Sequence, residues 1–66
     1  MKNNIKIQRA IANLTQAELA EKIGVSRQTI NAMELGKYVP STVLALKIAK
    51  VFEKSVDEIF ELEETD

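Results

Sequence analysis

The sequence predicts an all-α fold, with five short helices in a single domain that spans residues 1–66. Two observations lead to this prediction. Polar residues that cap helices, and glycines that end them, recur at short intervals along the chain. The alternation of apolar and polar residues that is typical of β-strands is nearly absent. With 66 residues, the chain can bury one hydrophobic core but not two.

The first two helices have clear boundaries. The first covers residues 5–12, and Asn13 tolerates the left-handed conformation that ends it. The second begins with a capping box, in which the hydroxyl of Thr15 accepts from the backbone N–H of Glu18 and the glutamate reaches back. Gly24 provides its stop signal.

Serine caps mark the other three helices. Ser26 precedes the third helix, which Gly36 closes, and Ser41 precedes the fourth, which is apolar nearly all round and is therefore expected at the centre of the core. Ser55 opens a second capping box with Glu58. The five predicted helices span residues 5–12, 16–23, 27–34, 42–52 and 56–60. The predicted core residues are Leu19, Ile23, Val25, Ile30, Leu46, Ile48, Ala49, Phe52 and Ile59.

The two ends of the chain leave an alternative open. Residues 1–4 and 60–64 are each long enough for a short strand, and the two could pair as a small two-stranded sheet. The alternative is fraying, which is the usual behaviour of chain termini.

Composition excludes several classes of function. Cysteine and histidine are absent, so the chain has no disulfide, no thiolate metal site and no histidine base. No apolar run approaches the roughly 20 residues that cross a bilayer, and no signal peptide is evident. We expect a cytoplasmic protein that is not an enzyme and uses no metal, cofactor, membrane or small-molecule ligand.

Charge is distributed unevenly along the chain. Residues 1–50 contain eight Lys/Arg and three Glu, a net charge of +5, whereas residues 51–66 have a net charge of −6. This asymmetry suggests a basic working surface and an acidic C-terminal stretch with another role, although charge alone allows two ordinary solvated faces equally well.

The most informative segment lies at about residues 16–34, where a helix, the turn Gly24-Val25-Ser26 and a second helix follow one another. A short turn with glycine between two helices is typical of the helix-turn-helix unit. At about 100° per residue, Arg27, Gln28 and Asn31 lie opposite the apolar face of the second helix. Arginine can bind guanine, and glutamine or asparagine can bind adenine, in the major groove. These three residues are the predicted base contacts.

Other residues near this unit are placed for phosphate. Gln16 begins the preceding helix, where free N–H groups and the helix dipole attract anions. Lys37 and Tyr38 follow the second helix and could grip the backbone, although the tyrosine ring could equally pack over the loop.

The stretch LTQAELAEKIGVSRQTINAMELGKY resembles the helix-turn-helix of the lambdoid phage Cro/repressor family, also called the XRE family. The likeness covers about residues 3–60, and its most specific parts are LTQAELA, GVSRQTI and ELGKYVPS. It is closest to the minimal members of the family, which consist of little more than this domain. The resemblance implies the λ-repressor-like fold of five helices, with the second and third forming the DNA-binding unit.

The resemblance also implies roles for individual residues. Gln16 matches a glutamine that binds phosphate and braces a side chain of the recognition helix, while Arg27 and Gln28 match base readers. Ser26, Thr29 and Asn31 match phosphate or secondary base contacts. Arg9 and Glu34 match an ion pair between the first and third helices. The sequence departs from the pattern at Ala32, where relatives often carry a polar base reader, and at Leu35, which replaces a commonly polar residue near phosphate.

Apolar residues in the last third of the chain predict a homodimer. Val39, Val43, Val56, Phe60 and Leu62 lack an obvious place in so small a core, and a contiguous apolar patch usually marks an association surface. Val39, Val56 and Phe60 are the predicted interface residues.

These patterns support one function above the others. We expect a sequence-specific transcriptional regulator, in particular a repressor, that binds a pseudo-palindromic double-stranded DNA operator as a homodimer. The alternative is an antitoxin-like or scaffolding protein-interaction module whose acidic surface meets a partner.

Overall fold

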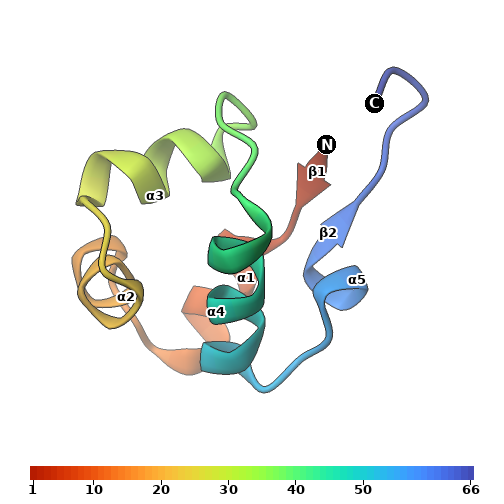
Figure 1. Ribbon diagram of the computed structural model, residues 1–66. Helices are drawn as coiled ribbons and strands as arrows, with labels where there is room; N and C mark the ends of the chain where they lie inside the picture. Colours follow the sequence, from red (N-terminus) through yellow and green to blue (C-terminus); the bar gives the residue numbers. More distant parts are fainter.

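The computed structural model describes residues 1–66 and contains five helices and one two-stranded sheet (Figure 1). In chain order the elements are β1 (Lys2–Asn3), α1 (Ile5–Ala12), α2 (Gln16–Ile23), α3 (Arg27–Glu34), α4 (Thr42–Phe52), α5 (Val56–Ile59) and β2 (Phe60–Glu61). The first four helices have the predicted boundaries. The fifth ends one residue early, because Phe60 adopts an extended backbone (φ −114°, ψ 141°) and begins β2.

Side chains at the helix starts satisfy backbone N–H groups that have no partner inside the helix. The hydroxyl of Thr15 accepts from the N–H of Glu18 at 3.0 Å, and the Glu18 carboxylate accepts from the N–H of Thr15 at 2.9 Å. The hydrogen bond from the Thr15 backbone N–H to the Glu18 carboxylate, and then that from the Thr15 hydroxyl, hold the pKa of Glu18 below its usual value. Ser26 and Ser41 cap α3 and α4 through their hydroxyl oxygens. The predicted capping signals are therefore confirmed for these three helices.

Left-handed residues end three of the helices. Asn13 (φ 58°) and Gly24 (φ 75°) follow α1 and α2, as predicted. Glu53 (φ 55°) follows α4, although glutamate gives no sequence signal for this conformation. At the next helix start, the Glu58 carboxylate accepts from both the backbone N–H and the hydroxyl of Ser55, each at 2.9 Å.

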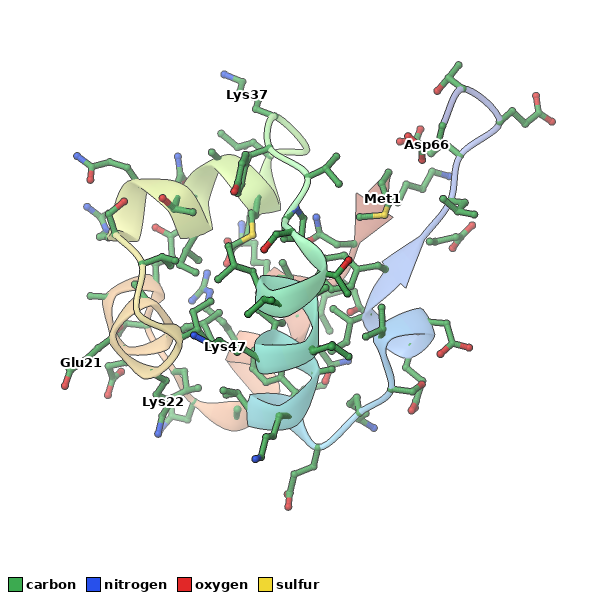
Figure 2. All side chains as sticks on the ribbon, in the orientation of Figure 1. Met1, Glu21, Lys22, Lys37, Lys47 and Asp66 are labelled. Atoms are coloured by element: carbon green, nitrogen blue, oxygen red, sulfur yellow. The ribbon has the colours of Figure 1, made fainter.

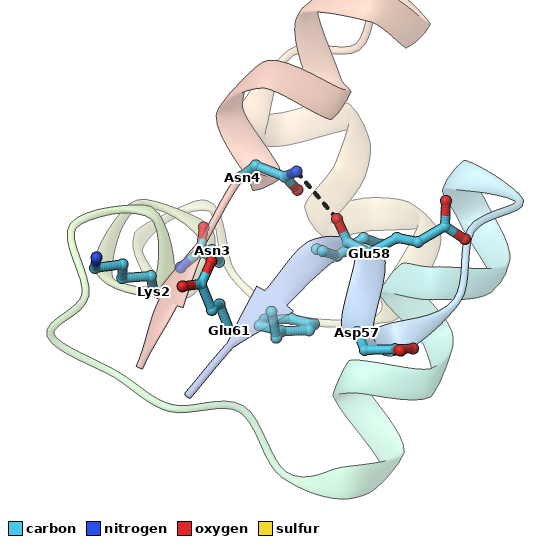
Figure 3. Close-up of a pocket in the computed structure, with 8 residues that line it drawn as sticks. Lys2, Asn3, Asn4, Asp57, Glu58 and Glu61 are labelled. Carbon is cyan, nitrogen blue, oxygen red and sulfur yellow. Dashed lines mark hydrogen bonds between the residues drawn. The ribbon is translucent and has the colours of Figure 1, made fainter. Parts of the chain in front are cut away.

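The two ends of the chain lie side by side (Figure 1). β1 and β2 pair antiparallel, with Lys2 opposite Glu61 and Asn3 opposite Phe60. Beside the sheet, the side-chain amide of Asn4 donates to the carbonyl of Glu58 at 3.1 Å (Figure 3). The backbone N–H of Asn4 also donates to the carbonyl of Ile59 at 3.0 Å. The ends therefore pair, and the terminal sheet is confirmed in place of fraying.

The core is formed by apolar side chains from all five helices and from β2. The fully or nearly buried residues are Ile5, Leu19, Ala20, Ile23, Ile30, Met33, Ile48, Ala49, Phe52, Ile59 and Phe60. No charged or polar residue is buried with them. None of the helices has the length and apolar character needed to span a bilayer.

Two expectations about burial were wrong. Leu46 was expected in the core, but it is 57% exposed. Only one face of α4 packs on the other helices, so an apolar residue on its outer face stays in solvent even in a helix that is apolar nearly all round. Phe60 was expected to lack a place in the core, but it is only 6% exposed, because β2 turns its ring onto the domain. Val25, also expected in the core, is half-buried.

An ion pair joins the first and third helices. The guanidinium of Arg9 donates to the carboxylate of Glu34 through Nε at 2.6 Å and through a terminal nitrogen at 3.1 Å. The same guanidinium donates to the carbonyl of Leu14 at 3.0 Å, at the junction between α1 and α2. The ion pair that the family resemblance implied is therefore present, and its two hydrogen bonds fix the relative orientation of the helices.

The pKa of Glu34 reflects this environment. Burial acts to raise it, but the hydrogen bonds from Arg9 and Gln16 outweigh burial and hold the pKa below its usual value. Because the folded chain then binds protons less readily than the unfolded chain, the stabilisation is complete above the unfolded-state pKa of about 4.3. It is lost as pH falls through the lower pKa of the folded state.

We therefore predict that Glu34→Gln destabilises the domain by about 3 kcal/mol near pH 7, since it leaves the Arg9 charge without its partner. The difference from the parent should shrink as pH falls below about 4, where the parent carboxyl also becomes neutral. Urea unfolding of both chains between pH 7 and pH 3 measures this, with Glu21→Gln, at an exposed carboxylate, as control. A difference that stays constant with pH would show that the Glu34 charge is not responsible.

Candidate nucleic-acid interface

The candidate interface is built on α2, the turn that follows it, and α3 (Figure 1). Gly24 takes a left-handed conformation, which lets the N–H of Val25 donate to the carbonyl of Ala20 at 3.0 Å. This hydrogen bond turns the chain sharply, and the Ser26 cap then starts α3. The predicted helix-turn-helix is therefore present, with its second helix at the surface of the molecule.

The two faces of α3 differ as predicted. Ile30 and Met33 are fully buried and attach the helix to the core. Arg27, Gln28 and Asn31 are exposed on the other face. Because the buried residues fix the rotation of the helix, the three predicted base contacts are presented together to solvent.

Gln16 connects α2 to the outer face of α3. Its side-chain nitrogen donates to Oδ1 of Asn31 at 3.2 Å and to the carboxylate of Glu34 at 3.1 Å. The glutamine thus braces a side chain of α3, as the family resemblance implied. Both of its amide hydrogens are used in these contacts. An anion at the start of α2 would therefore be bound by the backbone N–H groups of Gln16 and Ala17, which have no acceptor in the structure.

The brace also orients Asn31. Since Oδ1 of Asn31 accepts from Gln16, the side-chain nitrogen is left with both hydrogens free. The Asn31 amide is therefore held with a donor available to an acceptor outside the protein.

Two hydroxyl groups meet at the first turn of α3. Ser26 Oγ lies 2.9 Å from Thr29 Oγ1 and also accepts from the backbone N–H of Thr29 at 3.2 Å. Only one of the two hydroxyl hydrogens is needed for their mutual hydrogen bond, so the pair keeps one donor for an outside acceptor.

The loop after α3 carries the remaining predicted contacts. Lys37 projects from the tip of this loop away from the body of the domain (Figure 2), and it forms no ion pair. The ring of Tyr38 lines a hollow of about 450 Å³ together with Gln28, Ala32 and Leu44. The tyrosine is therefore placed beside the predicted base reader Gln28, at the join between α3 and α4.

Two features limit the polar and positive character of this face. Leu35 is exposed at the end of α3, so the outer face of the helix becomes apolar toward its C-terminus. The net positive charge of residues 1–50 does not gather here, because Arg9 is used in the ion pair with Glu34 and three lysines lie between α2 and α4. Arg27 and Lys37 are the cations that the candidate interface presents.

The predicted dimer residues are found in different environments. Val39 is exposed, Val56 is half-buried, and Phe60 belongs to the core. Val43 and Leu46 are exposed on the outer face of α4. Exposed apolar side chains therefore occur in the loop before α4 and on α4 itself.

Comparison with known proteins agrees with this geometry. The model of the family described as Helix-turn-helix (HTH_3) matches residues 5–59. An uncharacterized HTH-type transcriptional regulator of Methanocaldococcus jannaschii is 56% identical over 66 residues, covering 100% of both chains. The phage CTXphi transcriptional repressor RstR of Vibrio cholerae is 36% identical over 59 residues, which are 89% of this chain and 53% of RstR.

A solved structure shares the fold. The SOS-response transcriptional repressor LexA of Eubacterium rectale superimposes with a TM-score of 0.81 and is 28% identical, covering 96% of this chain and 67% of that structure. The matched family, the full-length relative and this fold lead to one conclusion: the chain is a transcriptional regulator with a DNA-binding domain of the helix-turn-helix (XRE) family.

Proposed function

We propose that the protein is a repressor that binds a pseudo-palindromic operator as a homodimer, with α3 of each copy in the major groove. The observation that carries the proposal is the outer face of α3, where Arg27, Gln28 and the braced Asn31 are exposed together. Repression is supported by the similarity to RstR, which is a transcriptional repressor.

The contacts divide into two kinds. Arg27 is suited to guanine, and Gln28 and Asn31 to adenine, through the edges that these bases present in the major groove. The free N–H groups at the start of α2, the Ser26 hydroxyl and Lys37 are suited to phosphate on either side of the groove. The phosphate contacts position the helix, and the base contacts select the sequence.

A homodimer is supported by the exposed apolar residues of α4 and the loop before it. Val43 (61% exposed) and Leu46 (57%) are three residues apart on one face of α4, and Val39 (57%) lies in the loop before the helix. Half-buried Val56 of α5 is a further candidate. A symmetric contact through this strip would present two α3 helices at once, and successive major grooves on one side of DNA are about 34 Å apart.

The decisive experiment is selection of bound sequences from random duplex DNA. The proposal expects a symmetric motif with two half-sites. A failure to enrich any motif would favour the alternative function, an antitoxin-like or scaffolding interaction module.

For base recognition, we predict that Arg27→Ala and Gln28→Ala each weaken binding to the selected operator by about 1–3 kcal/mol. Each should also relax the preference at one base pair in each half-site. Thermal unfolding should change little, because both side chains are exposed. Glu21→Ala, an exposed change on α2, is the control. If both variants keep the parent's sequence preference, α3 does not read the bases.

For phosphate contact, we predict that Lys37→Ala weakens binding to operator and random DNA almost equally. The slope of log K against log salt should become shallower by about one unit. Lys54→Ala, at a lysine in the loop after α4, is the matched control and should leave the slope unchanged. An unchanged slope in Lys37→Ala would remove this lysine from the interface.

For dimerisation, we predict that Val43→Asp and Leu46→Asp give folded monomers that bind the operator much more weakly. Phe60→Asp should instead unfold the domain, because it places a charge in the core. Analytical ultracentrifugation and circular dichroism separate these outcomes. The α4 strip would be excluded if both α4 variants sediment as the parent does, or if the parent is a monomer at tens of micromolar.

A further inference from the structure

A second surface with its own chemistry lies between α2 and α4. It is a hollow of about 610 Å³ whose apolar floor includes Leu14, Ile23 and Val51. Three lysines, Lys22, Lys47 and Lys50, stand around this floor. All three are exposed, and none forms an ion pair. We call these six residues the lysine groove.

The lysine groove is not part of the candidate DNA interface. Figure 2 shows Lys37 at the tip of the loop after α3, with Lys22 and Lys47 well below it on the flank formed by α2 and α4. None of the residues that line the groove is among the predicted base or phosphate contacts. Three lysines that form no ion pair, placed around an apolar floor, match an occupant in which an apolar side chain is flanked by carboxylates.

The chain carries such a segment at its other end. Leu62 is 76% exposed and lies in the sequence Glu61-Leu62-Glu63-Glu64. The carboxylates of Glu61 and Glu64 accept no hydrogen bond and form no ion pair within the domain, whereas Glu63 pairs with the Met1 ammonium at 3.0 Å. We call residues 61–64 the acidic tail. It presents an unsupported apolar side chain between free negative charges.

We propose that the acidic tail of one copy binds in the lysine groove of a second copy. Leu62 covers the floor formed by Leu14, Ile23 and Val51, and the tail carboxylates face the three lysines. The contact places opposite charges together and removes an exposed leucine from water.

The contact has to form between copies. In Figure 2 the chain end at Asp66 lies at the upper right, and Lys22 and Lys47 lie toward the lower left, with α4 between them. A tail therefore cannot reach the groove of its own domain. A head-to-tail contact leaves one free tail and one free groove, so it can repeat and place further copies beside a bound one.

The test compares the assembly size of the whole protein at two salt concentrations. Opposite charges are screened strongly at about 1 M salt and weakly at about 0.01 M, whereas the apolar strip of α4 does not depend on screening. Sedimentation velocity should therefore show larger species at low salt than at high salt. The species at high salt sets the baseline, whether it is a dimer or a monomer.

Charge reversal identifies the partners. Lys47→Glu/Lys50→Glu and Glu61→Lys/Glu64→Lys should each weaken the low-salt association at least about tenfold. The chain that carries all four changes should associate again, because the charges are complementary once more. Lys6→Glu/Lys54→Glu, which reverses two lysines outside the groove, should associate as the parent does.

Binding of a single operator is measured in parallel and should survive in the groove variant, so this inference and the proposed function can fail separately. The inference is overturned if the parent does not grow at low salt, or if the four-change chain does not recover. It is also overturned if reversing the groove matters and reversing the tail does not, because the groove would then hold a different partner.

Discussion

The ion pair between Arg9 and Glu34 is the contact on which the arrangement of the recognition surface depends. It joins α1 to α3, and the same arginine also binds the carbonyl of Leu14 where the chain turns into α2. Gln16 extends the network from Glu34 to Asn31 on the outer face. Because the side chains of Arg9 and Glu34 are largely shielded from solvent, loss of either partner is strongly unfavourable, and the three helices are held in one relative orientation. The exposed residues of α3 are therefore presented by a network that lies largely beneath them.

The paired chain ends support the same helix from its other end. The side-chain amide of Asn3, in β1, donates to the carbonyl of Met33 near the end of α3 at 2.8 Å, and the same carbonyl accepts from the backbone N–H of Gly36 at 3.0 Å. Oδ1 of Asn3 accepts from the N–H of Ile5 at 3.1 Å and so fixes the start of α1. Pairing with β2 holds Asn3 in place and brings Phe60 into the core. A sheet of two residues per strand thus contributes to the position of the recognition helix.

Charge and apolar surface are divided among three faces of a small domain. The outer face of α3 carries Arg27 and polar side chains, the outer face of α4 carries exposed apolar residues, and the flank between α2 and α4 carries the lysine groove. The acidic tail leads to the chain end at Asp66, which lies across the molecule from Lys22 and Lys47 (Figure 2). A net charge of −1 therefore conceals separate surfaces that suit DNA, a second copy and an acidic segment.

The sequence by itself determined the helices and the helix-turn-helix, because caps and stops act over three or four residues and need no distant partner. Thr15 marks the start of α2 and Gly24 marks its end. Local signals of this kind also gave the boundaries of four helices, and the spacing of apolar residues gave the exposed stripe of α3. Only the tertiary structure decided which apolar residues are buried. Leu46 is exposed and Phe60 is buried because these outcomes depend on which faces of α4 and β2 meet other elements. The left-handed Glu53 carries no signal in the sequence, because glutamate seldom adopts this conformation, and the place of the lysines depends on how α2 and α4 pack.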